Sequence, residues 1–340
     1  LFAPSSKKAN VAARGRFNLG EKLALSLCRS AEIISVNSAV RFDEDGRHAI
    51  RTRLASGSMF VGELRMNQQE FEELVAAAKA LIPPKGIVTT INGEVLPERV
   101  PLREFEVELP TEVADAEGNL RKTRRKTLVQ VFEPAPNETP SLYEMGIPVV
   151  ETKDKFHVNV GQKVPLTLDR ENVPPSYISA IRTCVLNNTS DLISATDANT
   201  NWVRQASSSP NCAPEAIKNV LDQRFGQKRV AYDPSDPEAN SRAVSSGFVV
   251  VHGGMLSSQE WSNAKDAGAI VPAGAKFGTP KPYSDDPNAP MEEVIEEKDW
   301  DEGMRRVAGY AKFLAKKLMG LESLNVKMSL AHNRFAAWYG

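Results

Sequence analysis

Apolar residues recur at helical spacing in two early stretches of the chain. Leu19, Leu23 and Leu27 lie four residues apart, which places them on one face of a helix. Residues 68–81 form a longer amphipathic pattern that ends at Pro83-Pro84. The apolar side of this second helix predicts a buried stripe made of Phe71, Leu74, Val75 and Ala78.

Alternation of polar and apolar residues predicts two blocks of strands. The first block has strands at 32–40, 49–54 and 58–64, with Asp45-Gly46 as a turn. The second block extends from about residue 86 to residue 168, and Asn92-Gly93 is one of its turns. Its predicted strands cover residues 87–91, 105–109, 127–132, 148–151 and 156–160.

Helices and strands alternate in the second half of the chain. Pro174-Pro175 opens a helix that ends near Leu192. The remaining segments suggest a small α/β layer with parallel pairing. Helices are predicted at 214–224, after 236–237 and at 257–267, and strands at 229–232 and 248–251. Residues 272–299 are rich in Pro, Gly and acidic residues and are expected to form a linker, and a final helix is predicted at 304–318.

Composition narrows the class of protein without naming a function. The 340 residues carry a formal net charge of −1, so overall charge gives no sign of a nucleic-acid or anionic-membrane partner. The three cysteines are far apart, which argues against a disulfide framework or a zinc site and fits a reducing cytoplasm. No apolar run is long enough to span a bilayer. We therefore expect a cytoplasmic α+β protein with no membrane partner.

Both ends of the chain have the character of internal segments. The chain opens on Leu1-Phe2 without an initiator methionine, and its last six residues, 335–340, are mostly apolar. Trimmed or processed termini would explain this, but we expect a fragment of a longer protein.

A glycine-rich segment, Gly15 to Lys22, is the sharpest local motif. It differs from a Walker A loop because Glu21 stands between Gly20 and Lys22, and because a polar loop precedes it where a buried strand is needed. Glycines followed by a helix N-terminus can still bind an anion through free N–H groups. From these residues alone, phosphate binding and an ordinary turn before a helix remain equal alternatives.

The segment from Ser5 to Ser30 resembles the ATP lid and second glycine box of the GHKL ATPases. This superfamily includes DNA gyrase B, a branch of heat-shock chaperones, the histidine kinases and MutL, of which MutL is the most similar. There a Thr-Ser-Lys segment opens the lid and a Gly-Phe-Arg-Gly-Glu-Ala-Leu type box closes it at a helix. Ser5-Ser6-Lys7 and Gly15–Leu23 correspond to these two parts, although Asn18 and Leu19 replace small residues. The resemblance implies that ATP is bound by Ser6, Lys7, Gly15, Arg16, Phe17, Asn18, Leu19, Gly20, Glu21 and Lys22.

Two further segments follow in the order of the same superfamily. Gly57-Ser58 stands where the family has a Gly-Thr box on a strand near the adenine, so Ser58 is assigned to nucleotide binding. Residues 158–163, Val-Asn-Val-Gly-Gln-Lys, resemble the strand-end lysine loop of the transducer domain. In those relatives the lysine reaches the γ-phosphate from a second domain, which implies a catalytic, phosphate-sensing role for Lys163 beside Gln162. The alternative is a lysine at the surface end of a strand.

The resemblance covers residues 1–192 and implies the fold and its parts. Residues 1–82 would be the C-terminal part of a GHKL-type ATP-binding sandwich, and residues 83–193 a transducer-like, S5-like β/α domain. Residues 194–271 would form a small α/β domain, and residues 272–340 an acidic linker, a helix and a terminal strand. The whole would be an ATP-binding and ATP-hydrolysing switch, often a homodimer in this superfamily.

The family's catalytic helix has no counterpart in this chain. That helix carries a glutamate that activates water and an asparagine that holds Mg²⁺, and a following Asp-x-Gly-x-Gly segment binds adenine. The chain alone would therefore bind ATP poorly and hydrolyse none, and its parent protein would use ATP and Mg²⁺. The alternative function is a non-catalytic scaffold, or a nucleic-acid-binding module, with a GHKL-like shape.

A basic run lies next to the predicted turn at Glu117-Gly118-Asn119. A hairpin of this kind could contact a nucleic-acid backbone, although charged edge strands also protect against aggregation, the reading that we favour. No aromatic residue interleaves the run, which argues against stacking on single-stranded bases. Its five cations are Arg121, Lys122, Arg124, Arg125 and Lys126.

Overall fold

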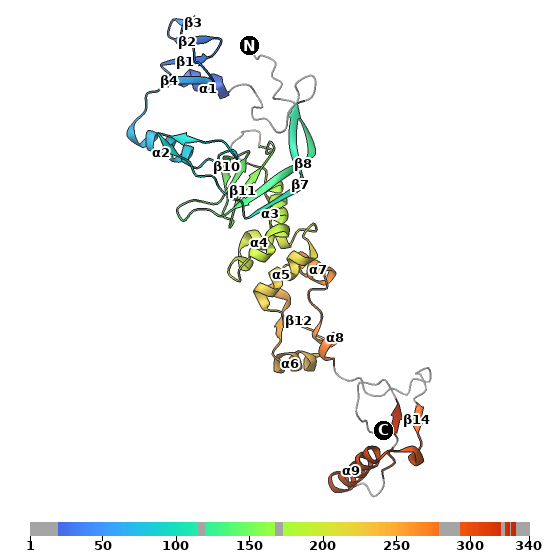
Figure 1. The fold of residues 1–340 in the computed structure, drawn as a ribbon. Helices are drawn as coiled ribbons and strands as arrows, with labels where there is room; N and C mark the ends of the chain where they lie inside the picture. Colours follow the sequence, from blue (N-terminus) through green and yellow to red (C-terminus); the bar gives the residue numbers. More distant parts are fainter. Residues whose placement is uncertain are drawn as a thin grey trace. The chain divides into compact units, whose positions relative to one another are not determined.

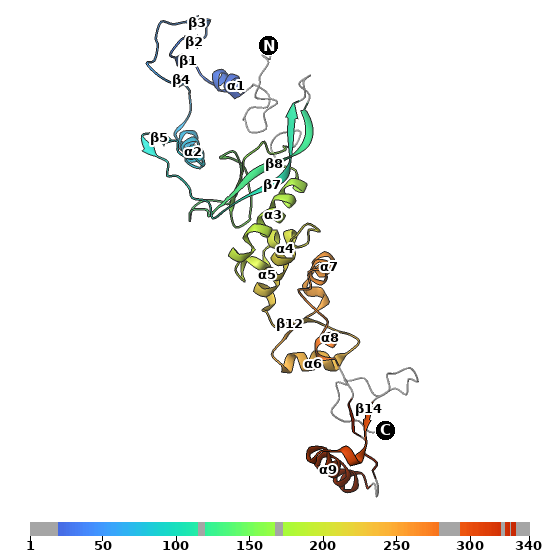
Figure 2. The same ribbon diagram turned by 45° about the vertical axis from the view of Figure 1, so that its right-hand side comes forward.

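The computed structural model describes residues 20–114, 120–166, 173–278, 293–320, 324–326 and 328–330 (Figures 1 and 2). Helices and both antiparallel and mixed sheets are present, as expected of an α+β protein. The chain divides into two compact units. Unit 1 comprises residues 1–232 and 247–271, and unit 2 comprises residues 233–246 and 272–340. The four-part division expected from the sequence stays a prediction.

The first described elements of unit 1 are a short helix and a four-stranded antiparallel sheet. Helix α1 (Gly20–Leu27) starts at the end of the glycine-rich segment, as its apolar spacing predicts. The sheet order is β3-β2-β1-β4, with β1 at Ser30–Ser35, β2 at Ala39–Asp43, β3 at Gly46–Ala49 and β4 at Ser58–Glu63. The turn at Asp45-Gly46 is confirmed, whereas the strand predicted at 32–40 is two strands paired with each other.

Helix α2 (Gln68–Lys79) forms where its pattern predicts it but does not bury its apolar side. Its N-terminus is closed by a capping box in which Asn67 and Glu70 exchange hydrogen bonds. The predicted buried stripe is wrong, because Phe71 and Leu74 are exposed and no residue of the helix is buried. Spacing reports which residues share a face, but burial needs a partner element. Among the described residues, Thr90–Ile91 contact the helix, and Val75 and Ala78 are only partly covered.

The second sheet has five strands in the order β10-β9-β11-β8-β7. Strands β9 and β11 are parallel, and the other neighbours are antiparallel. The strand at 141–144 was not expected from the sequence. The bounds are β7 Arg103–Ala114, β8 Leu120–Phe132, β9 Ser141–Glu144, β10 Ile147–Glu151 and β11 His157–Val160.

The chain between the two sheets contains a short hairpin and makes a backbone hydrogen bond to the second sheet. Strands β5 (Thr90–Ile91) and β6 (Glu94–Val95) pair across Asn92-Gly93, whose positive φ angles of 51° and 83° fit the predicted turn. Just before this hairpin, the N–H of Ile82 donates to the carbonyl of Gly146 at 2.9 Å. A Cβ added to Gly146 would meet the Ile82 oxygen at 2.3 Å, so this approach requires glycine.

Helices cover one face of the five-stranded sheet and form the main core. Helix α3 (Pro175–Thr189) packs Ile181 and Val185 into the same cluster as Leu109 and Val129 of the sheet. Helices α4 (Asn201–Ser207), α5 (Pro214–Phe225) and α7 (Ser258–Asp266) extend this core. Strands β12 (Arg229–Ala231) and β13 (Val249–Val251) pair in parallel, as predicted.

Unit 2 contains the remaining elements. Helix α6 (Pro237–Ser245) contacts α8 (Ala273–Phe277), so the predicted linker at 272–299 contains a helix at its start. Strands β14 (Glu293–Ile295) and β15 (Met328–Leu330) are antiparallel. Between them in sequence, α9 (Glu302–Met319) begins at the N-cap Asp301 and ends at Gly320 in the left-handed conformation, matching the predicted final helix.

Candidate functional site

The candidate lysine lies in a loop that follows β11 and crosses the end of the five-stranded sheet. The hydroxyl of Thr111, on β7, donates to the carbonyl of Lys163 at 2.8 Å. The N–H of Val164 donates to a carboxylate oxygen of Glu144, on β9, at 2.7 Å. Because β7 and β9 lie on opposite sides of β11 in the sheet, the two bonds fix the loop backbone from both directions.

Gly161 allows this loop to approach the neighbouring strand. Its N–H donates to the carbonyl of Leu128 on β8 at 2.9 Å. A Cβ at this position would stand 3.1 Å from the same carbonyl oxygen and 3.3 Å from the Thr127 hydroxyl. Glycine is therefore the residue that fits this close backbone contact.

Gln162 and Lys163 are both almost completely buried. Each is 1% exposed, although a lysine is among the residues least often found inside a protein. The side-chain amide of Gln162 donates to the carbonyls of Leu109 and Pro110 at 3.2 and 3.4 Å. Its oxygen has no hydrogen-bond partner. A lysine at the surface end of a strand, the alternative considered from the sequence, is excluded by this burial.

His157 belongs to a separate polar cluster on the same strand. The N–H of Ser141 donates to Nδ1 of His157 at 3.1 Å, so that nitrogen accepts and Nε2 carries the proton toward Glu138, 3.1 Å away. Arg99 donates through both terminal nitrogens to Glu138. These contacts fix the tautomer of His157 and its contact with Glu138 together. His157 therefore has a structural role and is not available as a catalytic base.

The pKa values of Glu138 and His157 are both lowered, one by a hydrogen bond and the other by burial. The hydrogen bond from Arg99 lowers the pKa of Glu138 from 4.5 to about 2. Burial lowers the pKa of His157, outweighing the carboxylate of Glu138, which raises it. His157 is 1% exposed, so we assign it to the core of the sheet domain.

Most of the expected ATP lid lies outside the described residues. This applies to Ser6, Lys7, Gly15, Arg16, Phe17, Asn18 and Leu19, and to the side chains of Glu21 and Lys22. The backbone of Gly20 begins α1. Ser58 begins β4 and is exposed, and β4 belongs to a different sheet from β11, the strand that leads to Gln162 and Lys163. Among the predicted site residues whose side chains the structure describes, it brings Gln162 and Lys163 together and places Ser58 on another sheet.

The basic run forms the first half of β8, opposite an acidic strand. Lys122 faces Glu112 and Lys126 faces Glu108 in the register of β7 and β8, while Arg124 donates to a backbone carbonyl of Glu108. Lys126 also pairs with Glu106 at 2.5 Å. These carboxylates offset much of the positive charge on this face, although Arg121 and Arg125 stand opposite Val113 and Leu109. Nucleic-acid binding by this hairpin stays a prediction.

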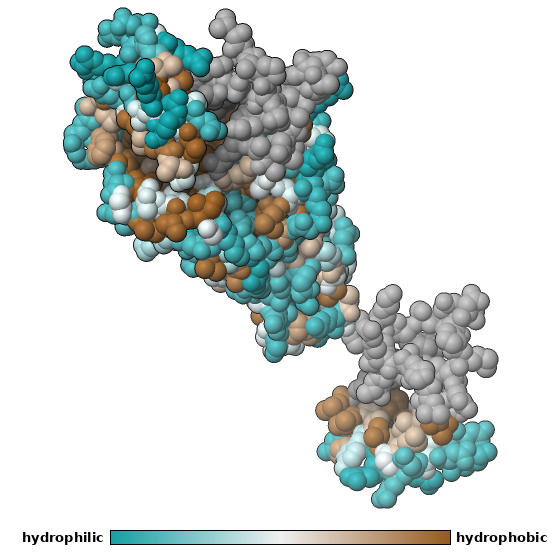
Figure 3. Space-filling model, turned by 45° about the horizontal axis from the view of Figure 1, so that its top comes forward, coloured by the Kyte–Doolittle hydropathy of each residue, from teal (hydrophilic) through white to brown (hydrophobic). Residues whose placement is uncertain are grey.

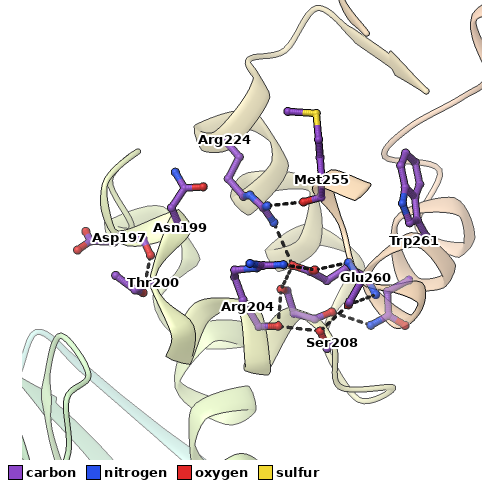
Figure 4. Close-up of polar contacts among 12 residues, drawn as sticks. Asp197, Asn199, Thr200, Arg204, Ser208, Arg224, Met255, Glu260 and Trp261 are labelled. Atoms are coloured by element: carbon purple, nitrogen blue, oxygen red, sulfur yellow. Dashed lines mark hydrogen bonds and ion pairs between the residues drawn. The ribbon is translucent and has the colours of Figure 1, made fainter. Parts of the chain in front are cut away.

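A buried ionic cluster that the sequence did not reveal joins three helices (Figure 4). Glu260 on α7 is 4% exposed and accepts from Arg224 of α5 at 2.9 Å, with Arg204 of α4 at 3.6 Å. The other carboxylate oxygen accepts the N–H of Ser257, closing a capping box. Arg224 also donates to the carbonyl of Met255. These contacts make Glu260 a structural residue that holds α4, α5 and α7 together, and we assign it no catalytic role.

Comparisons with known proteins give no further identification. No protein-family model matches the chain, and no curated protein matches it. Within the described ranges, no three His, Cys, Asp or Glu side chains are placed to hold a metal ion. In the same part of the chain, no helix is both long and apolar enough to cross a bilayer.

Proposed function

We propose that this chain supplies the phosphate-binding half of an ATP-driven conformational switch of the GHKL type. The proposal rests on the order of three features. A glycine-rich segment precedes a helix that starts at Gly20, a hydroxyl residue, Ser58, begins β4, and a Gly-Gln-Lys loop follows β11. This order corresponds to the lid, the adenine-side strand and the sensor lysine of the superfamily.

The observation that carries the proposal is the burial of Lys163 in a loop held at both sides. Removal of an ammonium group from water costs several kcal/mol, which the interactions of the buried group must offset. Such a cost is common where charged groups serve a function. The side chains of Thr111 and Glu144 hold the backbone of the loop on either side of the lysine. A buried lysine in a loop held in this way suits a switch that has two arrangements.

In this scheme, ATP shifts the population between those two arrangements. Without nucleotide, Lys163 stays in the stored position described above. When the γ-phosphate is present, the lysine leaves that position and pairs with it through a charge-assisted hydrogen bond. The difference in binding energy between the two states drives the conformational change. Loss of the γ-phosphate on hydrolysis returns the lysine to the sheet.

The remaining chemistry belongs to residues that the resemblance does not match to this chain. Water activation and the Mg²⁺ ligand would come from the family's first helix. In this role Mg²⁺ would screen the phosphate charges. The residues assigned here bind the nucleotide and sense its phosphate: the lid from Ser6 to Lys22, Ser58 on the adenine side, and Gln162 and Lys163.

Substitution of Lys163 in the full-length gene product tests the proposal. Lys163→Met keeps the length of the side chain but removes the charge, and we expect ATP turnover to fall on the order of 100-fold, as when one transition-state donor is removed. Affinity for a non-hydrolysable ATP analogue should fall toward that for ADP, because only the γ-phosphate contact is lost. Calorimetry and a phosphate-release assay measure the two effects.

The control is an exposed lysine outside the site. Lys218 on α5 is exposed, and Lys218→Met should leave turnover and nucleotide preference unchanged. Circular dichroism shows whether Lys163→Met has kept its fold, and Lys163→Arg, which retains a cation, should recover part of the ATP preference. A folded Lys163→Met protein with normal turnover and normal ATP preference would exclude the sensor role.

A further inference from the structure

Two hairpin turns of unit 1 have nearly the same backbone but different surroundings. Asn92-Gly93 joins β5 to β6 with φ angles of 51° and 83°, and Met145-Gly146 joins β9 to β10 with φ angles of 49° and 82°. Asparagine is favoured at the first position of such a turn, whereas methionine rarely adopts a positive φ. The Met145-Gly146 turn therefore forms against its local preference, which requires contacts from the surrounding fold.

Three backbone groups of the Met145-Gly146 turn have partners outside β9 and β10. The N–H of Met145 donates to the carbonyl of Val160 at 2.8 Å, and the N–H of Gly146 donates to Oδ1 of Asn159 at 2.7 Å. Both acceptors end β11, directly before the loop that contains the candidate lysine. The carbonyl of Gly146 accepts from the N–H of Ile82 at 2.9 Å, in the segment after α2 (residues 80–89). The turn thus joins this segment to the strand that leads into the lysine loop.

Side chains of β9 make the same connection. Ile82, Phe132 and Tyr143 are buried together in a small cluster. Tyr143 is followed by Glu144, whose carboxylate accepts from the N–H of Val164 at 2.7 Å. Strand β9 therefore contacts the segment after α2 through one residue and the far end of the lysine loop through the next.

The loop between these contacts contains a buried group that is not satisfied. Gln162 is 1% exposed, and its side-chain oxygen has no hydrogen-bond partner among the described residues. A buried acceptor without a partner destabilises the arrangement that contains it. The loop therefore depends on the contacts at its two ends, Val160 and Val164, to keep the observed position.

We propose that the Met145-Gly146 turn couples the segment after α2 to the loop that contains Lys163, and that Glu144 is the positioning residue for this loop. A displacement of Ile82 moves the turn, and the turn moves the loop on both sides of the lysine. The coupling is reciprocal, so a loop that leaves its position also shifts the segment after α2. That the coupling carries the state of a nucleotide rests on the function proposed above, but the coupling itself does not.

Amide hydrogen exchange of the purified chain, measured by NMR without nucleotide, tests the coupling. Ile82→Ala removes most of one side chain from the small cluster, and we expect the Val164 amide to exchange at least ~10-fold faster. The amides of α5, in the main core of the same unit, should keep their rates, which shows that the unit has not unfolded as a whole.

An exposed isoleucine in the same segment provides the matched control. Hydrophobic residues also lie at the surface of the chain, where Figure 3 draws them in brown. Ile87 is 62% exposed, and Ile87→Ala makes the same chemical change without opening a buried cluster. This variant should leave the exchange rate of Val164 unchanged.

Gly146→Ala tests the turn itself. The added Cβ would stand 2.3 Å from the carbonyl oxygen of Ile82, so the contact between the two residues must open. Gly93→Ala is the matched control, because its φ is nearly the same but its added Cβ meets no atom within 4 Å. Both variants introduce the strain of an alanine at positive φ, but only Gly146→Ala should accelerate exchange at Ile82 and Val164.

Two substitutions of Glu144 separate positioning from general packing. Glutamine keeps an oxygen that accepts from the N–H of Val164, so Glu144→Gln should keep the exchange rate of Val164 within ~3-fold of the parent, whereas Glu144→Leu should raise it at least ~10-fold. In the Glu144→Leu background, Ile82→Ala should add little to the rate at Val164, because both changes act through the same contact. Effects that multiply independently would show that Ile82 does not act through Glu144.

Two further results would overturn the coupling. One is an Ile82→Ala chain in which Val164 keeps the parent rate. The other is equal acceleration of Val164 and the α5 amides, which would show a general loss of stability. The ATP sensor is judged separately: coupled exchange with a Lys163→Met protein of normal ATP preference would retain the coupling and exclude the sensor. The reverse pair of results would retain the sensor and exclude the coupling.

Discussion

At the scale of single residues, the cluster of Arg99, Glu138 and His157 makes the stability of unit 1 depend on pH. The pKa of Glu138 is lowered to about 2 by Arg99, so its contribution is complete above about pH 4.5 and is lost as the pH falls toward 2. The shift corresponds to about 3 kcal/mol at most. Burial lowers the pKa of His157, so the unfolded chain takes up that proton first, and stability falls as the pH drops below about 6.5.

The contribution of His157 can be isolated by substitution. His157→Gln keeps an acceptor for the Ser141 N–H and a donor for Glu138 but does not titrate. We expect the free energy of unfolding of this variant to change less between pH 7 and pH 5 than that of the parent, while the loss below pH 4.5 remains. Urea titrations at each pH measure this. A slope for His157→Gln equal to that of the parent would contradict the assignment.

At the scale of elements, Glu260 determines how firmly α4, α5 and α7 are joined. Glu260→Gln preserves the shape of the side chain but leaves Arg224, whose side chain is 6% exposed, without its counter-charge. Loss of one partner from a buried pair costs about 3–5 kcal/mol, and we expect a decrease in unfolding free energy in that range. The exposed Glu238–Arg242 pair on α6 is the control: Glu238→Gln should cost less than ~0.5 kcal/mol. Equal effects in urea denaturation would show that Glu260 has no special role.

The elements that the sequence predicted correctly carry their signals locally. The capping box of Ser257 and Glu260 starts α7, and the Asn92-Gly93 and Asp45-Gly46 turns fix their hairpins. Strand β9 escaped prediction because its first three residues, 141–143, are all buried, so polar and apolar residues do not alternate. The pattern of α2 was recognised, but the buried stripe predicted from it was wrong, because burial depends on what the fold places beside the helix.

The candidate site shows the same limit more sharply. The position of Lys163 at the end of a strand followed from the sequence, but its burial did not. That burial depends on Thr111, 52 residues away along the chain, and on Glu144, which accepts from the neighbouring Val164. The ionic cluster at Glu260 likewise joins residues separated by 36 positions or more in sequence. Neither arrangement has a local motif, so both needed the fold.

At the scale of the whole molecule, the two units differ in the size of the side chains that they bury. The core of unit 1 is built from large residues such as Leu186, Trp202 and Phe225. In the part of unit 2 that the structure describes, the buried apolar residues are alanines with one tryptophan: Ala239, Ala243, Ala273, Trp300, Ala308 and Ala315. Burial of an alanine side chain contributes much less than burial of a leucine or phenylalanine, which contributes about 1.5–3 kcal/mol. Unit 2 should therefore be the less stable of the two.

Unfolding of the units can be followed separately, because each has a buried tryptophan. A variant that keeps only Trp202 reports unit 1, and one that keeps only Trp300 reports unit 2. We expect the Trp300 transition at a lower urea concentration and with a smaller m value, since a smaller unit exposes less surface. Adding Glu260→Gln should move the Trp202 transition alone, because all the partners of that cluster lie in unit 1. If both tryptophans reported one coincident transition, the chain would unfold as a single cooperative body, and the difference in core composition would have no thermodynamic consequence.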